Sequence, residues 1–405
     1  MTSARNRPPA VKRQFIDWVR EHAIFIDPAA PPDPKRLEPL DALLTGRQVA
    51  ALCTTTPYCA QYLQFRQWLL AYLVTRDFTL IATCESWAQA RRTDRLLHDP
   101  TGTGRLPTRD DVDLAQVLRG HALQGMSLNV FGFDIGGVDP QGWGELAALV
   151  AEAGAAHDVA TDAVRANLLR LLQQPPAPSP ADESARCGWA LEWVDLQFAA
   201  LTDRLGGEVY RQLVHGLTAL HDSLGYLTLV ASSETRAEAQ ALRHDVAQTN
   251  LASALADLYP GRRAAVLTEC VAEVADSTTP RPLSLHAFIR HTLAAEATFS
   301  VWLLHGGGRR GPTPTRGERA RGAARGARLT VPADSLNALL AGVGGTFLLP
   351  LNHADDPRAR AVLDDAGIVQ ADNSVVRCAV VREMDAIYFA PEITFAPEIT
   401  GPIRG

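Results

Sequence analysis

Short apolar runs alternate with longer segments of helical periodicity through the first third of the chain. RQVAAL at 47–52 precedes a helical pattern over 60–74, and FTLIATCES at 78–86 precedes another over 86–99. A third apolar run, SLNVFGFDI, occupies 127–135. Such alternation predicts parallel strands connected by helices that cover both faces of a sheet. We therefore expect an α/β fold with a mixed, mostly parallel sheet flanked by helices.

The middle of the chain has a different pattern. Ala- and Leu-rich helical periods follow one another from 144 to 258, broken by a proline-rich stretch at 173–184. This predicts a helical insertion subdomain over 144–258 between two parts of the α/β core, 1–143 and 259–405. An amphipathic helix is predicted over residues 13–27. Further strand-like runs occur at 262–274, 297–307, 345–351 and 384–394.

The amino-acid composition argues against some classes of binding partner. The 405 residues are 46% apolar, and the net charge of −6 leaves no basic surplus for nucleic acid or an anionic membrane. Basic residues concentrate in the Gly/Arg-rich run 306–328, for which we expect a solvated, mobile loop. With no signal peptide and no run of 18 apolar residues, the sequence predicts a cytoplasmic protein without a membrane span.

Motifs for metals, cofactors and common nucleophiles are missing from the sequence. The six cysteines form no CxxC pair and have no zinc-ligand spacing, so we expect reduced thiols. There is also no G-x-S-x-G, P-loop or G-x-G-x-x-G. The cluster of His353, Asp355 and Asp356 is more typical of a loop and helix cap than of a metal site. We expect neither a metal nor a cofactor.

Seven segments, in order along nearly the whole chain, resemble the erythromycin esterase-like superfamily. The match with the longest motif is QVAALCTTTPYCAQYLQFRQWLLAYLV at 48–74, beside a family pattern that contains Leu-Gly-Glu-x-Thr-His-Gly. The others are DWVREHA at 17–23, FTLIATCESW at 78–87, LRGHALQGMSLNVFGFDI at 118–135, LRHDVAQTNL at 242–251, RRAAVLTECVAEV at 262–274 and MDAIYFAPEIT at 384–394. The resemblance implies an α/β core with a helical insertion and a small-molecule cleft.

The same resemblance implies altered chemistry. Esterases of the family are thought to use a histidine base, helped by glutamates and an arginine, to activate water. Aligned on the family motif, its first glutamate falls on Thr54 and its base histidine on Pro57. Proline has no titratable group and cannot take a proton from water. The family arginine corresponds to Arg66, which would bind an oxygen or anion in the cleft, unless it forms an ordinary ion pair on the helix surface.

The family's second glutamate corresponds either to Cys84 or to Glu85, depending on the loop alignment. Only one of two adjacent strand residues can face the cleft. A partly desolvated Glu85 could act as an acid or base, or it could be a solvated acid at the end of a strand. Cys84 is more typical of a small core residue. Glu269 and Glu273 stand where the family has histidines; they could divide acid and base roles or be surface acids.

Other candidates would orient a substrate rather than react. The hydroxyl groups of Thr54, Thr56 and Tyr58 are predicted to contact it, and Asp134 to position a loop at the binding site. Cys84 is a further candidate for contact with the substrate if it faces the cleft in place of Glu85. Cys53 and Cys59 flank the threonine-rich loop. They have no histidine at a spacing that identifies a partner, so we expect structural thiols.

These observations lead to a hypothesis and two alternatives. The hypothesis is an enzyme of bacterial secondary metabolism that cyclises or isomerises a bulky, mostly apolar small molecule, with Arg66 and a carboxylate such as Glu85 polarising it. One alternative is a catalytically inactive relative that binds a metabolite or a partner protein. The other is an ester hydrolase whose base lies at a different position.

Overall fold

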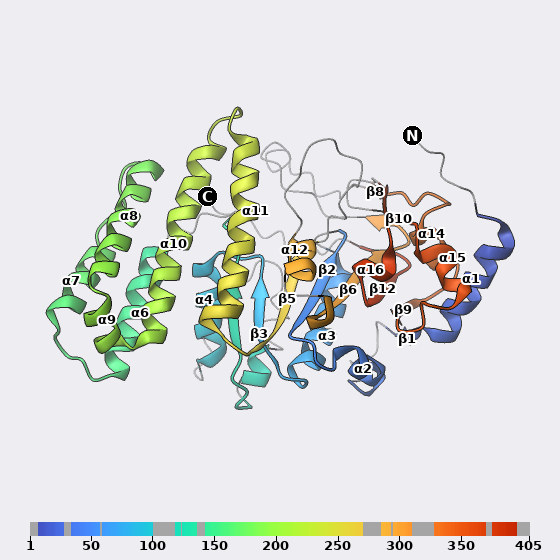
Figure 1. The fold of residues 1–405 in the computed structure, drawn as a ribbon, viewed down its shortest axis with the longest axis horizontal. Helices are drawn as coiled ribbons and strands as arrows, with labels where there is room; N and C mark the ends of the chain where they lie inside the picture. The colour runs from blue at the N-terminus through green and yellow to red at the C-terminus, as the bar shows by residue number, and fades with distance from the viewer. Residues whose placement is uncertain are drawn as a thin grey trace. The chain divides into compact units, whose positions relative to one another are not determined.

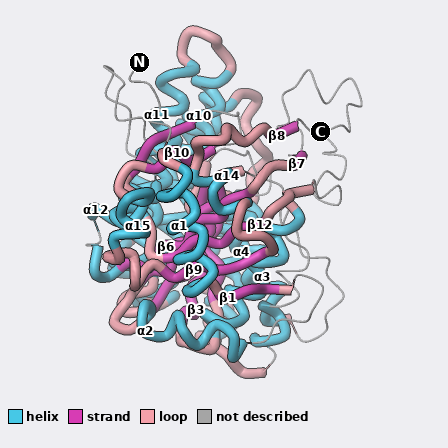
Figure 2. Tube along the Cα trace, turned by 90° about the vertical axis from the view of Figure 1, so that its right-hand side faces the viewer, coloured by secondary structure: helices cyan, strands magenta, loops and turns pink. Residues whose placement is uncertain are grey.

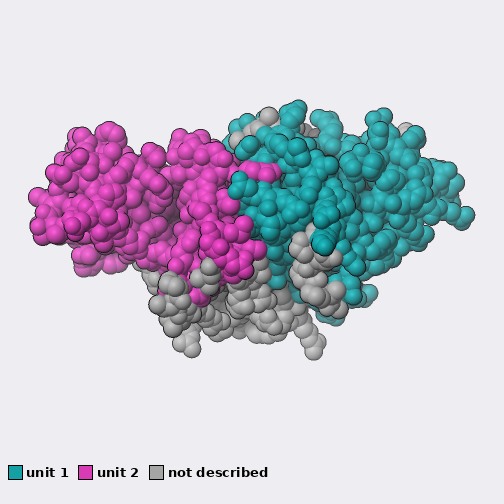
Figure 3. Space-filling model, turned by 90° about the horizontal axis from the view of Figure 1, so that it is seen from below, with its two compact units in different colours: residues 1–78, 109–118, 265–405 teal, residues 79–108, 119–264 magenta. Residues whose placement is uncertain are grey.

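The computed structural model describes residues 7–27, 34–56, 59–99, 118–122, 124–135, 142–269, 285–292, 295–309, 328–369 and 375–394. The chain forms two compact units (Figure 3). Unit 1 comprises residues 1–78, 109–118 and 265–405, and unit 2 comprises residues 79–108 and 119–264. The helical region predicted at 144–258 falls wholly within unit 2.

Eight strands form one sheet in the order β1-β9-β12-β6-β2-β5-β3-β4 (Figure 1). The pairs β2–β6, β6–β12 and β3–β4 are parallel, whereas β9 runs antiparallel to β12 and to β1. The predicted α/β fold, a mixed and mostly parallel sheet flanked by helices, is confirmed. The sheet strands are β1 Ile24–Ile26, β2 Val49–Thr54, β3 Phe78–Thr83, β4 Asn129–Gly132, β5 Arg263–Glu269, β6 Thr298–His305, β9 Thr346–Pro350 and β12 Ala386–Ala390.

Two smaller antiparallel pairs lie outside this sheet. They are β7 Gly308–Arg309 with β8 Arg328–Leu329, and β10 Ala366–Val369 with β11 Val375–Cys378. The first pair brackets residues 310–327, so most of the Gly/Arg-rich run lies outside the described residues.

Helices connect the strands and form most of unit 2. None of the helices in the described part of the chain is long and apolar enough to cross a membrane. They are α1 Pro9–His22, α2 Asp41–Leu44, α3 Ala60–Val74, α4 Trp87–His98, α6 Gly142–Ala156, α7 Ala163–Leu172, α8 Pro180–Leu196, α9 Phe198–Leu205, α10 Gly207–Val230, α11 Arg236–Ser253, α12 Leu285–Thr292, α14 Leu336–Ala341, α15 Pro357–Leu363 and α16 Val380–Glu383, with the short helical segments η1 Pro34–Leu40, η2 Ala254–Leu258 and η3 Ala295–Ala297.

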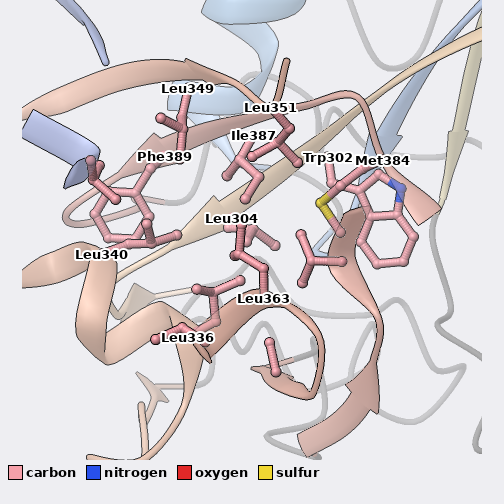
Figure 4. Close-up of a cluster of buried hydrophobic side chains, with 14 of the residues drawn as sticks. Trp302, Leu304, Leu336, Leu340, Leu349, Leu351, Leu363, Met384, Ile387 and Phe389 are labelled. Atoms are coloured by element: carbon pink, nitrogen blue, oxygen red, sulfur yellow. The ribbon is translucent and has the colours of Figure 1, made fainter. Parts of the chain in front are cut away.

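In unit 1, α1, α14 and α15 cover one face of the central strands (Figure 2). Alternate residues of β6 and β12, among them Trp302, Leu304 and Phe389, point into this apolar layer (Figure 4). On the opposite face lies α3, where the ring of Phe65 stacks on that of Tyr388 with 3.9 Å between centroids. The strand residues between those of the apolar layer therefore face α3.

The helix predicted over residues 13–27 is too long. α1 ends at His22, and Ile24–Ile26 form the edge strand β1 beside β9. Phe25 packs edge-on against Phe347 of β9. Strand pairing thus competes successfully with helix for this short apolar run, whose pattern alone cannot separate the two.

In unit 2, β3 leads into α4 and the long helices follow one another as predicted. The Ser86 hydroxyl accepts the Gln89 backbone N–H and caps α4. The proline-rich stretch separates α7 from α8, and Ser179 caps the second of these helices. Asp356 likewise caps α15 in unit 1, which confirms the helix cap predicted there.

Candidate functional site

The threonine-rich loop begins at the carboxyl end of β2, inside unit 1. Thr54 is the last residue of the strand, and Thr55 donates a hydrogen bond to the carbonyl of Leu303 in β6 at 2.8 Å. Thr56 is fully buried. Its hydroxyl has no hydrogen-bond partner among the described residues. Tyr58, like Pro57, lies outside the described residues.

Arg66 lies on α3 and points towards this loop. One terminal nitrogen of its guanidinium is 3.4 Å from the Thr54 hydroxyl and 3.4 Å from the carbonyl oxygen of Thr268 in β5. Its Nε is buried and has no partner among the described residues. No acidic side chain described in the structure forms an ion pair with Arg66. Its guanidinium is hydrogen-bonded instead to two uncharged groups, the Thr54 hydroxyl and the Thr268 carbonyl.

Cys59 and Tyr62 complete the wall between the loop and α3. The Cys59 thiol donates to the Thr56 carbonyl at 3.6 Å. Burial raises the pKa of this thiol to about 12, although the charge of Arg66 acts in the opposite direction. Burial also raises the pKa of Tyr62 well above its usual value. Both side chains are therefore neutral at pH 7, and the Tyr62 hydroxyl is buried without a partner among the described residues.

His305 is a candidate that the sequence reasoning missed. It is the last residue of β6 and is fully buried. The parallel register places Thr54 beside Leu303, so His305, two residues further on, faces the same side of the sheet as Thr54. Neither ring nitrogen has a partner among the described residues. Burial lowers the pKa of His305 to about 4, so its imidazole is neutral at pH 7.

A sequence signal for His305 existed. The residue ends the apolar run TFSVWLLH just before three glycines. Polar residues that follow the carboxyl end of a parallel strand stand at the edge where α/β proteins bind ligands. Metal-ligand spacing along the chain says nothing about a residue that a strand register brings to the same face as the threonines.

The remaining predicted residues of the β3 and β4 ends belong to unit 2. Glu85 is partly buried in the turn after β3, and its backbone carbonyl accepts the Asp134 N–H at 3.0 Å. The Asp134 carboxylate is buried and accepts two hydrogen bonds from the Arg243 guanidinium of α11. This contact raises the pKa of Arg243. Asp134 also accepts the Ile135 N–H at 2.7 Å, a bond within its own loop.

The prediction that Cys84 is a small core residue is wrong, because this cysteine is exposed. β3 ends at Thr83, so Cys84 lies in the turn rather than on the strand. The turn passes tightly over β4: a Cβ on Gly132 would lie 2.4 Å from the carbonyl oxygen of Ser86. Only glycine fits there, and Cys84 precedes this contact in the turn, outside the buried strand.

Two predicted carboxylates cannot be placed. Glu269 ends β5, but its side chain is not described, and Glu273 lies outside the described residues. Within the described ranges there is no group of three His, Cys, Asp or Glu side chains that could hold a metal ion. In unit 1, Thr54, Thr56, Cys59, Tyr62 and Arg66 lie around the end of β2, and the strand register places His305 on the same face of the sheet as Thr54. These six residues are hereafter the β2–β6 cluster.

No family model and no curated protein matches this sequence. Solved structures do resemble it over nearly its whole length. A Bacillus cereus protein has 13% sequence identity and a TM-score of 0.69, with 95% of this chain and 98% of that chain covered. A succinoglycan biosynthesis protein has 14% identity and a TM-score of 0.68, with 96% and 98% covered.

The third structure is that of an erythromycin esterase mutant in its open conformation. It has 16% identity and a TM-score of 0.61, with 92% of this chain and 97% of that chain covered. The chain therefore has an erythromycin esterase-like fold, as the sequence resemblance implied. At these identities the likeness extends to the fold and does not assign residue roles.

Proposed function

We propose that the chain is an enzyme that binds a small molecule at the β2–β6 cluster and rearranges it without adding water. The observation that carries the proposal is a set of five buried polar atoms in the cluster without partners among the described residues: Thr56 Oγ1, the Tyr62 hydroxyl, Arg66 Nε, and both ring nitrogens of His305. Leaving such an atom unbonded costs about 1–3 kcal/mol. Protein interiors seldom retain several of these atoms together unless a ligand or water bonds them.

The chemical types in the cluster suit a substrate oxygen that gains negative charge. Arg66 and Thr56 supply an N–H and an O–H for that oxygen. The neutral His305 has one nitrogen that can accept a proton and one that can donate a proton. His305 would take a proton from the carbon beside a substrate carbonyl, and the resulting enolate would be stabilised by Arg66. Return of the proton to another carbon completes an isomerisation. A cyclisation results instead when the enolate carbon attacks an electrophilic carbonyl carbon of the same molecule and the proton goes to the oxygen that receives the electron pair. Neither reaction changes the composition.

The sequence resemblance supports the absence of added water, because Thr54 and Pro57 occupy the places of the family's glutamate and base histidine. We further propose that the substrate is a bulky, mostly apolar molecule of bacterial secondary metabolism. Glu85, Cys84 and Asp134 in unit 2, together with Tyr58, Glu269 and Glu273, remain proposed site residues that need separate substitution tests.

The test is a mass-spectrometric assay of the purified protein with macrolides and related polyketide lactones, which reads mass and retention time together. A retention shift at unchanged mass, lost in Arg66→Ala and His305→Leu, is the expected result. Gln64→Ala, an exposed position on the same helix, should leave the shift intact.

Other outcomes point to the alternative functions. A gain of the mass of one water molecule would identify an ester hydrolase with a relocated base. A compound that binds to the protein and is recovered with its mass and retention time unchanged would identify a binding protein. Either result would contradict the proposed isomerase or cyclase.

A further inference from the structure

A pocket of about 240 Å³ opens in unit 2, where the start of α4 meets α6, α10 and the proline-rich segment before α8. Its walls include Trp87 at the start of α4, Trp143 in α6, and Leu220, Leu224 and Leu227 along one side of α10. All of its lining residues belong to unit 2. The proposed chemistry of the β2–β6 cluster makes no use of it.

The carboxylate and hydroxyl groups around the pocket are already bonded to other parts of unit 2, whereas the indole N–H of Trp143 is buried with no partner among the described residues. The buried Glu183 carboxylate lies 3.3 Å from the Arg186 guanidinium and accepts the backbone N–H of Ala177. The Ser223 hydroxyl donates to a carbonyl of its own helix at 2.7 Å, and the Ser86 hydroxyl caps α4. What the pocket offers a ligand is therefore apolar area, with no free charge to pair.

The walls are held in place without a ligand. Arg186 is buried, donates to the carbonyls of Leu171, Gln174 and Pro175, and so ties the proline-rich segment to α8. Its guanidinium also lies over the ring of Trp143, 4.0 Å from the centroid. On the other side Trp87 packs on Gly216, where a Cβ would lie 2.6 Å from the indole ring. A preformed pocket spares a ligand the cost of ordering its walls.

We propose that this pocket is a second binding site, specific for a neutral, apolar molecule of one or two fused rings. The size follows from its volume. An apolar cavity of about 150 Å³ holds benzene, and pockets for drug-sized ligands begin near 300 Å³. The ligand must be neutral because Glu183 is already paired with Arg186. A charged ligand would lose its hydration in the pocket and find no partner there. Two tryptophans and three leucines supply the apolar contact.

The test uses 1-aminonaphthalene, a fluorescent molecule that is neutral at pH 7, with the full-length protein. Saturable binding is expected with a Kd on the order of 100 µM or tighter. Leu220→Trp places a large ring in the pocket and should weaken binding about tenfold or more. Val230→Trp adds the same ring at the exposed end of α10 and should leave the Kd unchanged. Circular dichroism confirms that each variant is folded.

Two further comparisons decide the chemical class. Ser223→Ala removes a hydroxyl that is bonded within its helix, so binding should persist. The sulfonated derivative of the probe should bind at least tenfold more weakly, because it carries a charge into an apolar pocket. Equal binding of the sulfonate, loss of binding in Ser223→Ala, or an unchanged Kd in Leu220→Trp would overturn the proposal. If Leu220→Trp does not fold, Leu227→Trp fills the same pocket from a partly exposed position.

Discussion

Two buried histidines of unit 1 lie near opposite ends of β6, one on α12 and one on the strand itself, and their surroundings differ in one respect. Near the start of the strand, the Nε2 of His286 lies 2.8 Å from the Ser300 hydroxyl and accepts the Trp302 indole N–H at 3.4 Å. Its ring also has a hydrogen bond to the backbone of Glu383. At the far end, neither nitrogen of His305 has a partner among the described residues.

Burial is the same in the two places, so burial does not explain the difference. The pKa of His286 falls to about 3 and that of His305 to about 4, in both cases chiefly because burial disfavours the charged ring. The bonded histidine holds α12 against the sheet. The unbonded one ends β6 and faces the same side of the sheet as Thr54. Hydrogen-bond satisfaction thus separates a structural histidine from one that is available to a ligand.

The largest expected effect on stability is near the start of β6, where His286 is hydrogen-bonded. Asp385 accepts hydrogen bonds from the Ser300 N–H at 2.8 Å and from Arg290 at 3.0 Å, and Arg290 is buried. Asp385→Ala should lower the free energy of unfolding by about 3–5 kcal/mol, because it leaves a buried charge unpaired. Urea denaturation measures this. The exposed pair of Asp365 and Arg377 is the control, where Asp365→Ala should cost less than about 1 kcal/mol.

The next test replaces each histidine by a residue of similar size. His286→Leu should destabilise the protein by about 2–3 kcal/mol, because the Ser300 hydroxyl and the Trp302 indole lose their acceptor. His305→Leu should leave the stability unchanged or raise it. The substitution removes two buried polar atoms that have no partner among the described residues, and it takes a hydrogen-bond partner from no other described group. The comparison of the two ends fails if His305→Leu is the more destabilising variant in urea denaturation.

Much of this architecture was predictable because its signals are local. The helix predicted over residues 60–74 is α3, and the apolar runs around Val49 and Phe78 are β2 and β3. A buried parallel strand requires an uninterrupted apolar run, and a connecting helix requires apolar residues at helical spacing. Where one short run satisfied both patterns, as at Ile24–Ile26, the sequence could not choose between them.

The site was less predictable because it depends on register. The resemblance identified Thr54 and Arg66, but His305 joins them only through the pairing of β6 with β2, about 250 residues apart along the chain. The exposure of individual side chains was equally hard to predict from the sequence. Cys84 directly follows an apolar strand and is of a residue type common in cores, yet the strand ends at Thr83 and Cys84 is exposed in the turn. No pattern within a short window contains either fact.

A pH series sharpens the comparison with a smaller effect. The folded-state pKa values of His286 and His305, about 3 and about 4, lie below the unfolded value of about 6.5. The unfolded chain therefore binds more protons below pH 6.5. The stability that each neutral histidine contributes is full above that pH and is lost as the pH falls towards its folded pKa. Each site contributes a slope of up to about 1.4 kcal/mol per pH unit.

Urea denaturation of the wild type and His305→Leu between pH 6.5 and 4.5 measures this slope. The free energy of unfolding of the variant should fall less over the interval, because the contribution of up to about 1.4 kcal/mol per pH unit from His305 is absent. The stability of the variant relative to the wild type should therefore grow as the pH falls. Parallel curves for the two proteins would show that His305 is protonated in the folded state and is not a neutral acid–base group.

The smallest effect is expected at two neighbouring threonines, which repeat the contrast between bonded and unbonded atoms within one loop. Thr55 donates to the Leu303 carbonyl at 2.8 Å, whereas the Thr56 hydroxyl is buried without a partner among the described residues. Replacing each by valine keeps the shape and removes the hydroxyl. Thr55→Val should cost about 1 kcal/mol of stability, and Thr56→Val should cost nothing or stabilise the fold.

Activity should show the opposite order if the Thr56 hydroxyl contacts a substrate oxygen. Thr56→Val would then slow the rearrangement while its thermal unfolding temperature stays at or above that of the wild type. Thr55→Val would unfold a few degrees earlier and keep its turnover. Loss of stability in Thr56→Val would mean that the hydroxyl bonds within the folded protein, for instance through a buried water, and the β2–β6 cluster would then be better explained as structure than as a site.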